Sequence, residues 1–376
     1  MLRKISENLE IVKDKEVIIR VDYNVPIING GVGEKYRIEK SINTIQTLLD
    51  HGARKIVLIS HRGRPSGRDN SLSLRPLIPI IEQLLDGKVL FAETINDARN
   101  IEKGVVLLEN IRFWDGEISN DEGFINELVS LGEVFINEAF SVSHRKHASV
   151  YGIAKKLKSF AGLWLEKEIV NMEKISQSED MVLILGGGKL ETKLPVIENL
   201  AERSKKMLLG GALIFPFIKA KELSIGKSKN EEELVPKAKE LLDNYKEKLV
   251  LPQDLMLDNE EIVNIEEIPA DRKALDIGPE AVQEYIDIIS SAKNIFWNGP
   301  MGMYEDERFR HGTIEIARGI AESNAFSVIG GGDTLVVIEE LGLIDRYGFV
   351  STGGGASLSF LAGKRLPGLE VLGYYD

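Results

Sequence analysis

Hydrophobic positions along the chain predict two successive blocks in which short strands alternate with helices. In the first block, β-branched runs predict buried strands, and apolar residues at helical spacing predict amphipathic helices at residues 37–50 and 76–85. Strands that alternate with helices in this way form parallel sheets. The strands of the first predicted sheet are residues 16–21, 55–60, 105–108 and 134–137.

The same alternation restarts in the second half of the chain and predicts a second parallel sheet. Amphipathic helices are predicted at residues 282–290 and 313–323. Between the two blocks, apolar residues at near-helical spacing in residues 161–175 predict a helix that joins two domains. The strands of the second predicted sheet are residues 181–185, 207–209, 249–251, 294–297, 326–329 and 349–351.

Composition and charge remove several classes of function. The 376 residues exceed the usual length of one core, and the absence of Cys excludes disulfides, thiolate metal sites and cysteine nucleophiles. A net charge of -12 argues against general nucleic-acid binding. No apolar run approaches the roughly 18 residues of a membrane span, and residues 1–15 are charged throughout, unlike a signal peptide. We therefore expect a cytoplasmic protein without nucleic-acid or membrane partners.

Charged side chains gather where the strands of the first block end. A single Arg is more commonly a solvated surface charge, but recurrence at successive strand ends favours a shared site. Arg presents paired donors that suit carboxylate and phosphate, so the pattern points to a small, multiply anionic ligand. Asp22 and Asn24 follow the first strand, where local turn formation is the alternative role. We call the segments that follow the strands the tips of the sheet. The basic residues at or near these tips are Arg37, His61, Arg62, Arg64, Arg112, His144, Arg145 and His147.

Glycine-rich runs end the strands of the second block. Such turns let backbone N–H groups and helix N-termini approach phosphate oxygens, which predicts a nucleotide site. Neither the P-loop pattern nor the dinucleotide fingerprint is present, which disfavours P-loop enzymes and dehydrogenases. Asp333 is a candidate Mg²⁺ ligand or a helix N-cap, and Glu305 is a candidate ribose acceptor or an exposed loop residue. The runs are GGGK at 186–189 with Lys193 beyond it, GG at 210–211, NGPMG at 298–302, GGGDT at 330–334 and TGGGAS at 352–357.

These motifs resemble those of phosphoglycerate kinase, and the resemblance covers essentially the whole chain. The chain departs from the family pattern at Tyr23, where Phe is usual, at Gly188, where Ala or Ser is commoner, and at Glu138, where Asp is usual. None of these removes a proposed ligand. The motifs that carry the resemblance are RVDYNVP at 20–26, SHRGRP at 60–65, LLENIRF at 107–113, WNGPMG at 297–302, GGGDT at 330–334 and STGGGAS at 351–357.

The resemblance implies an α/β fold of two Rossmann-like domains, each a parallel β-sheet flanked by helices, joined by an interdomain helix. The expected first domain is residues 1–160 with a C-terminal tail of about 354–376, and it binds 3-phosphoglycerate or 1,3-bisphosphoglycerate. The helix 161–175 leads to a nucleotide-binding domain of residues 176–353. The implied acid-binding residues are Asp22, Asn24, Arg37, His61, Arg64, Arg112 and Arg145.

The resemblance also implies a Mg²⁺-dependent reaction with ADP or ATP, in which a monomer transfers a phosphoryl group reversibly between 1,3-bisphosphoglycerate and ADP. We hypothesise in-line transfer after hinge closure, with Arg37, Lys193, Gly331 and Gly332 as the catalytic set and Asp333 on the metal. The alternatives are another ATP-dependent carboxylate kinase and a non-catalytic nucleotide-binding protein on the same fold. The implied nucleotide-binding residues are Lys189, Lys193, Asn298, Glu305, Gly331, Gly332, Asp333 and Thr334.

Overall fold

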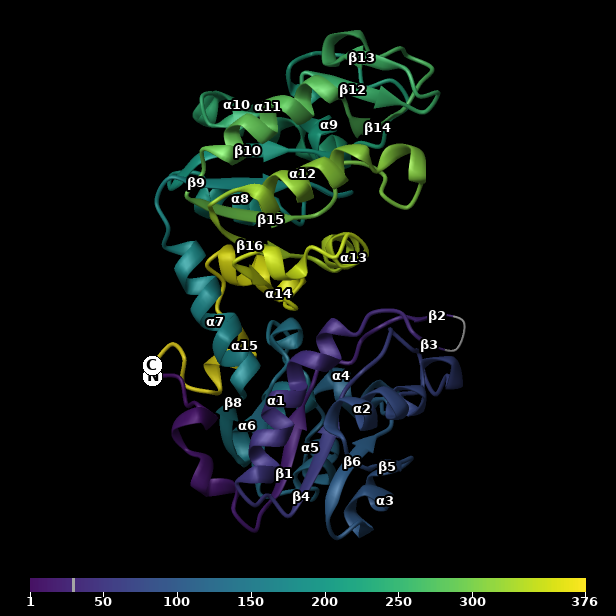
Figure 1. The fold of residues 1–376 in the computed structure, drawn as a ribbon, viewed down its shortest axis with the longest axis vertical. Coiled ribbons are helices and arrows are strands. Elements are labelled where there is room, and N and C mark those ends of the chain that lie inside the picture. The colour runs from purple at the N-terminus through teal and green to yellow at the C-terminus, as the bar shows by residue number, and fades with distance from the viewer. Residues whose placement is uncertain (29–30) are drawn as a thin grey trace. The chain divides into compact units, whose positions relative to one another are not determined.

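The computed structural model describes residues 1–28 and 31–376, which form two compact units (Figure 1). The first unit is Met1–Val170 with Arg365–Asp376, and the second is Asn171–Lys364. Helix α7 (Leu163–Ser176) runs from the first unit into the second. The C-terminal segment that joins the first unit begins at Arg365, not at about residue 354, because α14 (Gly355–Leu361) packs on α8 (Leu194–Leu200) within the second unit.

The first unit contains a six-stranded parallel sheet. Its strand order is β5-β6-β4-β1-β7-β8, so the four predicted strands are the four central strands of the sheet. The edge strands β5 and β8 were not predicted. A short antiparallel hairpin, β2 (Ile27–Ile28) and β3 (Gly31–Val32), lies outside this sheet. The strands of the sheet are β1 (Glu16–Arg20), β4 (Lys55–Ile59), β5 (Val89–Ala92), β6 (Gly104–Leu108), β7 (Val134–Asn137) and β8 (Lys158–Ala161).

Alternate residues of these strands pack into two separate cores, one on each face of the sheet. Val17 and Ile19 lie in the core that contains residues of α1 and α2, whereas Ile18 lies in the core that contains residues of α3, α5 and α6. Because both faces are covered, the strands are apolar almost throughout. The helices of this unit are α1 (Tyr36–Asp50), α2 (Ile78–Leu85), α3 (Ile95–Asn100), α4 (Gly116–Ser119), α5 (Glu122–Val129), α6 (Ile153–Lys156) and α15 (Pro367–Glu370).

The second unit contains another six-stranded parallel sheet, in the order β11-β10-β9-β15-β16-β17, and all six of its strands were predicted. Every residue of β9 is buried, as expected for a central strand covered on both faces. The strands are β9 (Met181–Leu185), β10 (Ser204–Leu209), β11 (Leu249–Val250), β15 (Asn294–Asn298), β16 (Phe326–Gly330) and β17 (Phe349–Val350). The remaining helices are α9 (Phe215–Ala220), α10 (Val235–Tyr245), α11 (Pro279–Ser290), α12 (His311–Glu322) and α13 (Gly332–Glu340).

A small antiparallel sheet in the second unit was not predicted. It is formed by β13 (Ile262–Asn264), β12 (Asp254–Leu257) and β14 (Ala274–Ile277), and Figure 1 shows it at one end of that unit. β12 and β14 each include an Asp, Asp254 or Asp276, and β13 has three residues that are not buried, so none of them shows the continuous apolar run of the predicted strands. The fold class itself, two parallel sheets flanked by helices, is confirmed.

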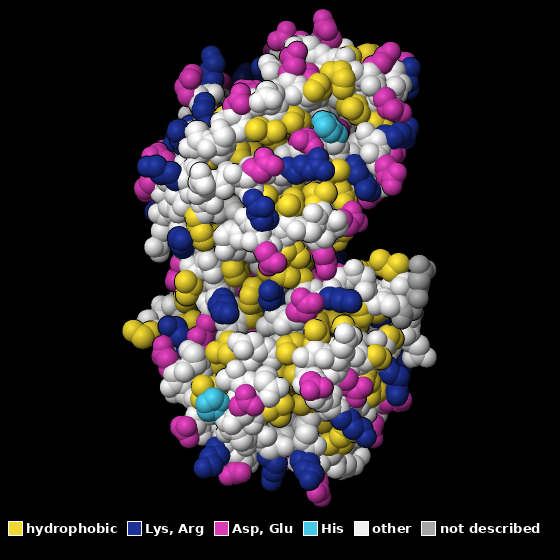
Figure 2. All heavy atoms as spheres, viewed as in Figure 1, with side chains coloured by type: hydrophobic (Ala, Val, Ile, Leu, Met, Phe, Trp, Pro, Cys, Tyr) yellow, Lys and Arg dark blue, Asp and Glu magenta, His cyan; other side chains and the backbone are white. Residues whose placement is uncertain are grey.

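Acidic and basic side chains are interspersed on the face of each unit that Figure 2 shows. Among the described residues, no helix is long and apolar enough to cross a membrane.

Candidate functional site

The strand order of the first sheet brings the predicted basic tips to one edge. Strands β6, β4, β1 and β7 are neighbours, and parallel strands end at the same edge of a sheet. Arg112 follows β6, and His61 and Arg64 follow β4. Asp22 follows β1, and Arg145 lies in the loop after β7. Four separate segments of the sequence therefore contribute to one site.

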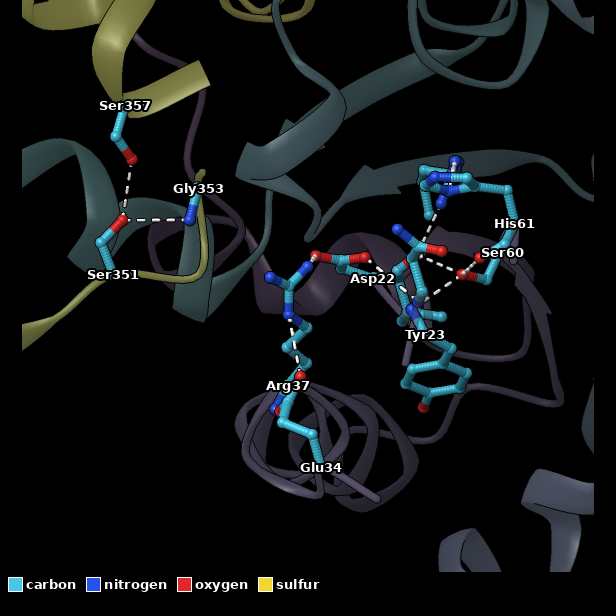
Figure 3. Close-up of polar contacts among 12 residues, drawn as sticks. Asp22, Tyr23, Glu34, Arg37, Ser60, His61, Ser351, Gly353 and Ser357 are labelled. Carbon is cyan, nitrogen blue, oxygen red and sulfur yellow. Dashed lines mark hydrogen bonds and ion pairs between the residues drawn. The ribbon is translucent and has the colours of Figure 1, made fainter. Parts of the chain in front are cut away.

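Arg37, near the start of α1, is held by two carboxylates (Figure 3). Its Nη1 lies 2.7 Å from Oδ2 of Asp22, and its Nε lies 3.0 Å from Oε2 of Glu34. Burial disfavours the guanidinium charge, but Asp22 and Glu34 outweigh burial and raise the pKa of Arg37. Glu34 was not predicted as a site residue, although its place three residues before Arg37 allows an i,i+3 pair.

The other cations of the first unit lie close enough to repel one another. Burial, together with the charges of Arg20 and Arg145, lowers the pKa of Arg112 to about 10. Burial and the charge of Arg64 likewise lower the pKa of Arg145. Arg64 itself is exposed. Cations gathered in this way are stabilised by an anionic ligand, which makes the cluster suited to bind one.

Hydrogen bonds to the backbone of Gly63 hold two of the predicted residues, Asn24 and Arg112, in place. Asn24 accepts a bond of 2.8 Å from the Gly63 N–H through Oδ1, and Arg112 donates a bond of 2.5 Å to the Gly63 carbonyl. Gly63 has a φ of +67°, in the left-handed region that favours glycine. All seven predicted acid-binding residues thus lie at this edge of the first sheet.

Two basic residues of the tips have other partners. Arg62 donates to the carbonyls of Ser71 and Ser73, at 2.7 and 2.6 Å, and so braces a loop. His144 accepts from Arg145 at 3.1 Å, and burial lowers its pKa to about 4. A further Arg, Arg20, was missed by the sequence reasoning, although a charged residue that ends an apolar strand is a usable signal.

The glycine tips of the second unit approach one another through their backbones. A Cβ atom on Gly186 would lie 2.1 Å from the Pro300 carbonyl oxygen, and one on Gly211 would lie 2.7 Å from the Gly187 nitrogen. Gly211 and Gly299 also have φ of +64° and +95°. The ends of β9, β10 and β15 therefore pack in a way that only glycine allows at these positions.

Lys193 is buried beside Asn298. Its Nζ donates to Oδ1 of Asn298, and the side chain of Asn298 is 2% exposed. Burial lowers the pKa of Lys193 to about 8, and the charge of Asp333 partly offsets this effect. Nδ2 of Asn298 is buried and donates to no acceptor in the described residues. Both side chains thus retain hydrogen-bonding capacity for a ligand.

Gly331 and Thr334 organise the start of α13. Gly331 is the N-cap residue, with a φ of +103°, and the helix begins at Gly332. The Thr334 hydroxyl accepts a bond of 2.8 Å from the Gly299 N–H, so it also holds the neighbouring glycine turn. The sequence left open whether Asp333 is an N-cap or a ligand. It occupies the second position of the helix and is exposed, so it is not the N-cap.

Two adjoining hollows contain the predicted nucleotide residues. One, of about 290 Å³, is lined by the tips after β9, β15 and β16 and by Lys189, Lys193, Asn298, Asp333 and Thr334. The other, of about 430 Å³, shares Gly187, Gly188, Pro300 and Asp333 with it. Apolar residues such as Phe215 and Leu255 line the larger hollow, together with Glu305. A polar, glycine-lined hollow thus continues into a more apolar one.

Hydrogen bonds of two serines hold the last glycine run, which follows β17, in place. Figure 3 shows the Ser351 hydroxyl between the Ser357 hydroxyl and the Gly353 N–H, at 2.9 and 3.0 Å. Gly354 is the N-cap residue of α14 and has a φ of +51°. Gly354 and Gly355 also line the smaller hollow.

Among the described residues, no group of three or more His, Asp or Glu side chains is placed to hold a metal ion without a bound ligand. Asp333 nevertheless fits a metal that is bound mainly by nucleotide phosphates, because Mg²⁺ takes one or two protein carboxylates in such sites. Its carboxylate is exposed at the start of α13 and lines both hollows.

Comparisons with known proteins show the family to which the chain belongs. The family model for phosphoglycerate kinase matches residues 7–364. The phosphoglycerate kinase of Aquifex aeolicus is 44% identical over 99% of both chains, and that of Rubrobacter xylanophilus is 40% identical over 99% of this chain and 98% of the relative. The crystal structure of phosphoglycerate kinase from Pyrococcus horikoshii OT3 matches with a TM-score of 0.89 at 32% identity, and covers 100% of this chain and 99% of that one. The chain belongs to the phosphoglycerate kinase family.

Proposed function

We propose that this chain catalyses reversible phosphoryl transfer from 1,3-bisphosphoglycerate to ADP, giving 3-phosphoglycerate and ATP, in glycolysis and gluconeogenesis. Membership in the family supports this reaction. One observation carries the proposal: the chain contains two candidate anion sites of different construction, one for each substrate. One is the mutually repelling cation cluster of the first unit, and the other is the glycine-lined hollow with Lys193 in the second.

The first unit binds the acid in this proposal. 3-Phosphoglycerate carries a carboxylate and a phosphate, and planar guanidinium groups bind both through paired hydrogen bonds. Burial and the repulsion between neighbouring cations lower the pKa values of Arg112 and Arg145, and an anion among these side chains offsets both effects. The residues assigned to the acid are Asp22, Asn24, Arg37, His61, Arg64, Arg112 and Arg145.

The second unit binds the nucleotide. The larger hollow suits the base, and Glu305 provides an acceptor for a ribose hydroxyl. Backbone N–H groups at Gly331 and Gly332 and the N-terminus of α13 favour phosphate oxygens. Lys189, Lys193, Asn298 and Thr334 line the phosphate hollow. Asp333 is the residue that would hold Mg²⁺, and the bound ion supplies neutralisation of phosphate charge.

Phosphoryl transfer needs alignment and charge stabilisation, and no side-chain nucleophile. Lys193 places a buried cation beside the phosphate hollow, and Arg37 supplies a guanidinium at the acid site. With the two substrates assigned to different units, the reaction requires a closed state in which the units bring the reacting oxygens into line. X-ray scattering should therefore report smaller dimensions with both substrates than with neither, and unchanged dimensions would contradict closure.

A coupled assay tests the proposed function. ATP consumption should require 3-phosphoglycerate and should stop when Mg²⁺ is chelated. Turnover of unphosphorylated glycerate at a comparable rate would favour another carboxylate kinase, and nucleotide binding without turnover would favour a non-catalytic protein. We further propose a cytoplasmic monomer without nucleic-acid or membrane partners, in keeping with the net charge of -12. Sedimentation at working concentration checks the monomer.

A further inference from the structure

Arg20 is a buried cation beside His61, one of the residues assigned to the acid substrate. It is the last residue of β1, and its side chain is fully buried. Burying a charge is unfavourable unless hydrogen bonds and an opposite charge compensate for it. Arg20 donates to the Val21 carbonyl at 2.6 Å and to the Ser149 hydroxyl at 3.0 Å, and its Nη2 lies 3.0 Å from Nδ1 of His61.

Glu117 supplies the opposite charge. Ser149 donates to its carboxylate twice, from the hydroxyl at 2.7 Å and from the backbone N–H at 2.9 Å. Burial opposes the charge of Glu117, but His147, Arg20 and Ser149 outweigh burial and lower its pKa. Glu117 therefore stays anionic and Arg20 stays cationic, linked through Ser149.

The contact between Arg20 and His61 determines where the His61 proton lies. A guanidinium group has donors and no acceptor, so Nδ1 of His61 must be the acceptor and cannot carry a proton. A neutral imidazole then carries its proton on Nε2. A second proton is opposed by burial of His61 and by the charges of Arg20, Arg112, Arg145 and His147, which hold the pKa of His61 well below its ordinary value.

We propose that Arg20 is a positioning residue that fixes His61 as the neutral Nε2–H tautomer, so that His61 offers the acid substrate a directed donor in place of a mobile cation. This inference rests on the proposed function, because it assigns His61 to the substrate. It gives the site one donor whose protonation is constant over the physiological pH range. The surrounding guanidinium groups of Arg64, Arg112 and Arg145 then supply the charge.

Nitrogen-15 NMR of the full chain tests the tautomer directly. Long-range ¹H–¹⁵N spectra distinguish a protonated ring nitrogen from an unprotonated one, and His61→Gln identifies the His61 signals. We expect Nδ1 unprotonated and Nε2 protonated from pH 8 to pH 5, with Nε2 shifting when 3-phosphoglycerate is added. A proton on Nδ1, or an imidazolium above pH 6, would overturn the inference. So would an unshifted Nε2 at saturating 3-phosphoglycerate in a chain that phosphorylates it, whereas failure of the proposed function appears separately as absence of turnover.

The variant Arg20→Met tests the positioning role. Without the donor, His61 should exchange between tautomers and titrate nearer its ordinary pKa of about 6.5. The KM for 3-phosphoglycerate should then rise about tenfold at pH 8 and vary with pH, while the KM for ATP stays unchanged. The control Arg99→Met removes an exposed Arg of the same unit whose partner is Ser130, and it should retain the Nε2–H tautomer. If Arg20→Met does not fold, the wild-type spectrum still decides the tautomer. A wild-type pH profile in Arg20→Met would overturn the positioning role.

Discussion

The two units have their proposed anion sites at the same place in the same kind of sheet, but the two sites are built by opposite means. At the carboxyl ends of the first sheet, side-chain cations gather, and Asp22, Glu34 and Glu117 balance part of their charge. At the carboxyl ends of the second sheet, glycine turns and the start of α13 line a hollow, and Lys193 is a buried cation beside it. A backbone N–H group carries no net charge, so removing it from water costs less free energy than removing a charged side chain. It reaches a ligand only where the chain comes close to that ligand, which glycine allows. In the proposed function, recognition of the small acid thus depends on side chains, and binding of the nucleotide phosphates depends on chain geometry.

Removing the buried cation of the second unit should have the largest effect. In Lys193→Met the charge beside the phosphate hollow is lost, and we expect kcat to fall about 100-fold or more, as when a charge-stabilising donor is removed. The coupled assay measures it. Lys205→Met, an exposed residue of the same unit, is the control and should keep its kcat. A near-normal kcat in Lys193→Met would remove Lys193 from the catalytic set.

A methyl group at a glycine tip tests the dependence on backbone geometry. In Gly186→Ala the new Cβ would meet the Pro300 and Gly299 carbonyl oxygens at 2.1 and 2.7 Å, so the tips must separate. We expect the free energy of unfolding to fall by about 1–3 kcal/mol and ADP to bind at least tenfold more weakly. Gly188→Ala is the matched control, because its Cβ would meet no atom within 4 Å. Equal ADP affinity in the two variants, by calorimetry, would contradict the account.

Removing one exposed cation tests the side-chain site without disturbing its core. Arg64→Met loses one charged hydrogen bond to the acid, worth about 1.5–3 kcal/mol, so the KM for 3-phosphoglycerate should rise roughly tenfold or more. The KM for ATP should not change. Arg68→Met, at another exposed Arg of the same loop, should alter neither constant more than about twofold. If both variants raise the KM equally, the effect is general surface charge and the assignment of Arg64 is wrong.

A buried carboxyl in the first unit should have the smallest effect. Glu138 accepts from the Trp164 N–H at 2.9 Å near the start of α7, and burial raises its pKa to about 8. The folded state therefore holds this proton more tightly than the unfolded chain, whose carboxyl has its ordinary pKa of 4.5. Stability from this group is then present below pH 4.5 and is lost as the pH rises through 8.

The variant Glu138→Gln should abolish this pH dependence while changing the unfolding free energy by about 1 kcal/mol or less at pH 7, because the amide oxygen still accepts the Trp164 N–H. Urea unfolding at pH 5 and pH 8 measures it. Glu133→Gln, at an exposed Glu of the same unit, is the control. A wild-type difference between the two pH values in Glu138→Gln would show that another group is responsible.

The sequence predicted both parallel sheets because strands buried on two faces are continuously apolar. It did not reveal β12 to β14, because β12 and β14 each contain an Asp and β13 is not buried. Nor did it reveal that α14 packs within the second unit, which depends on tertiary contacts with α8. Site residues with exposed polar tips, such as Arg64 and Asp333, were recognisable from their place after strands. Glu34 and Arg20 were missed, because their roles lie in the partners they hold, and the sequence does not show which side chains meet.

The division of labour between the units is tested most directly by mapping each substrate onto the full chain with amide NMR. We predict that 3-phosphoglycerate alone shifts most strongly the amides of residues 22–24, 61–64 and 112. ADP alone should shift most strongly those of residues 186–189 and 330–334. The largest 3-phosphoglycerate shifts at the glycine tips, or the largest ADP shifts at residues 61–64, would contradict the account.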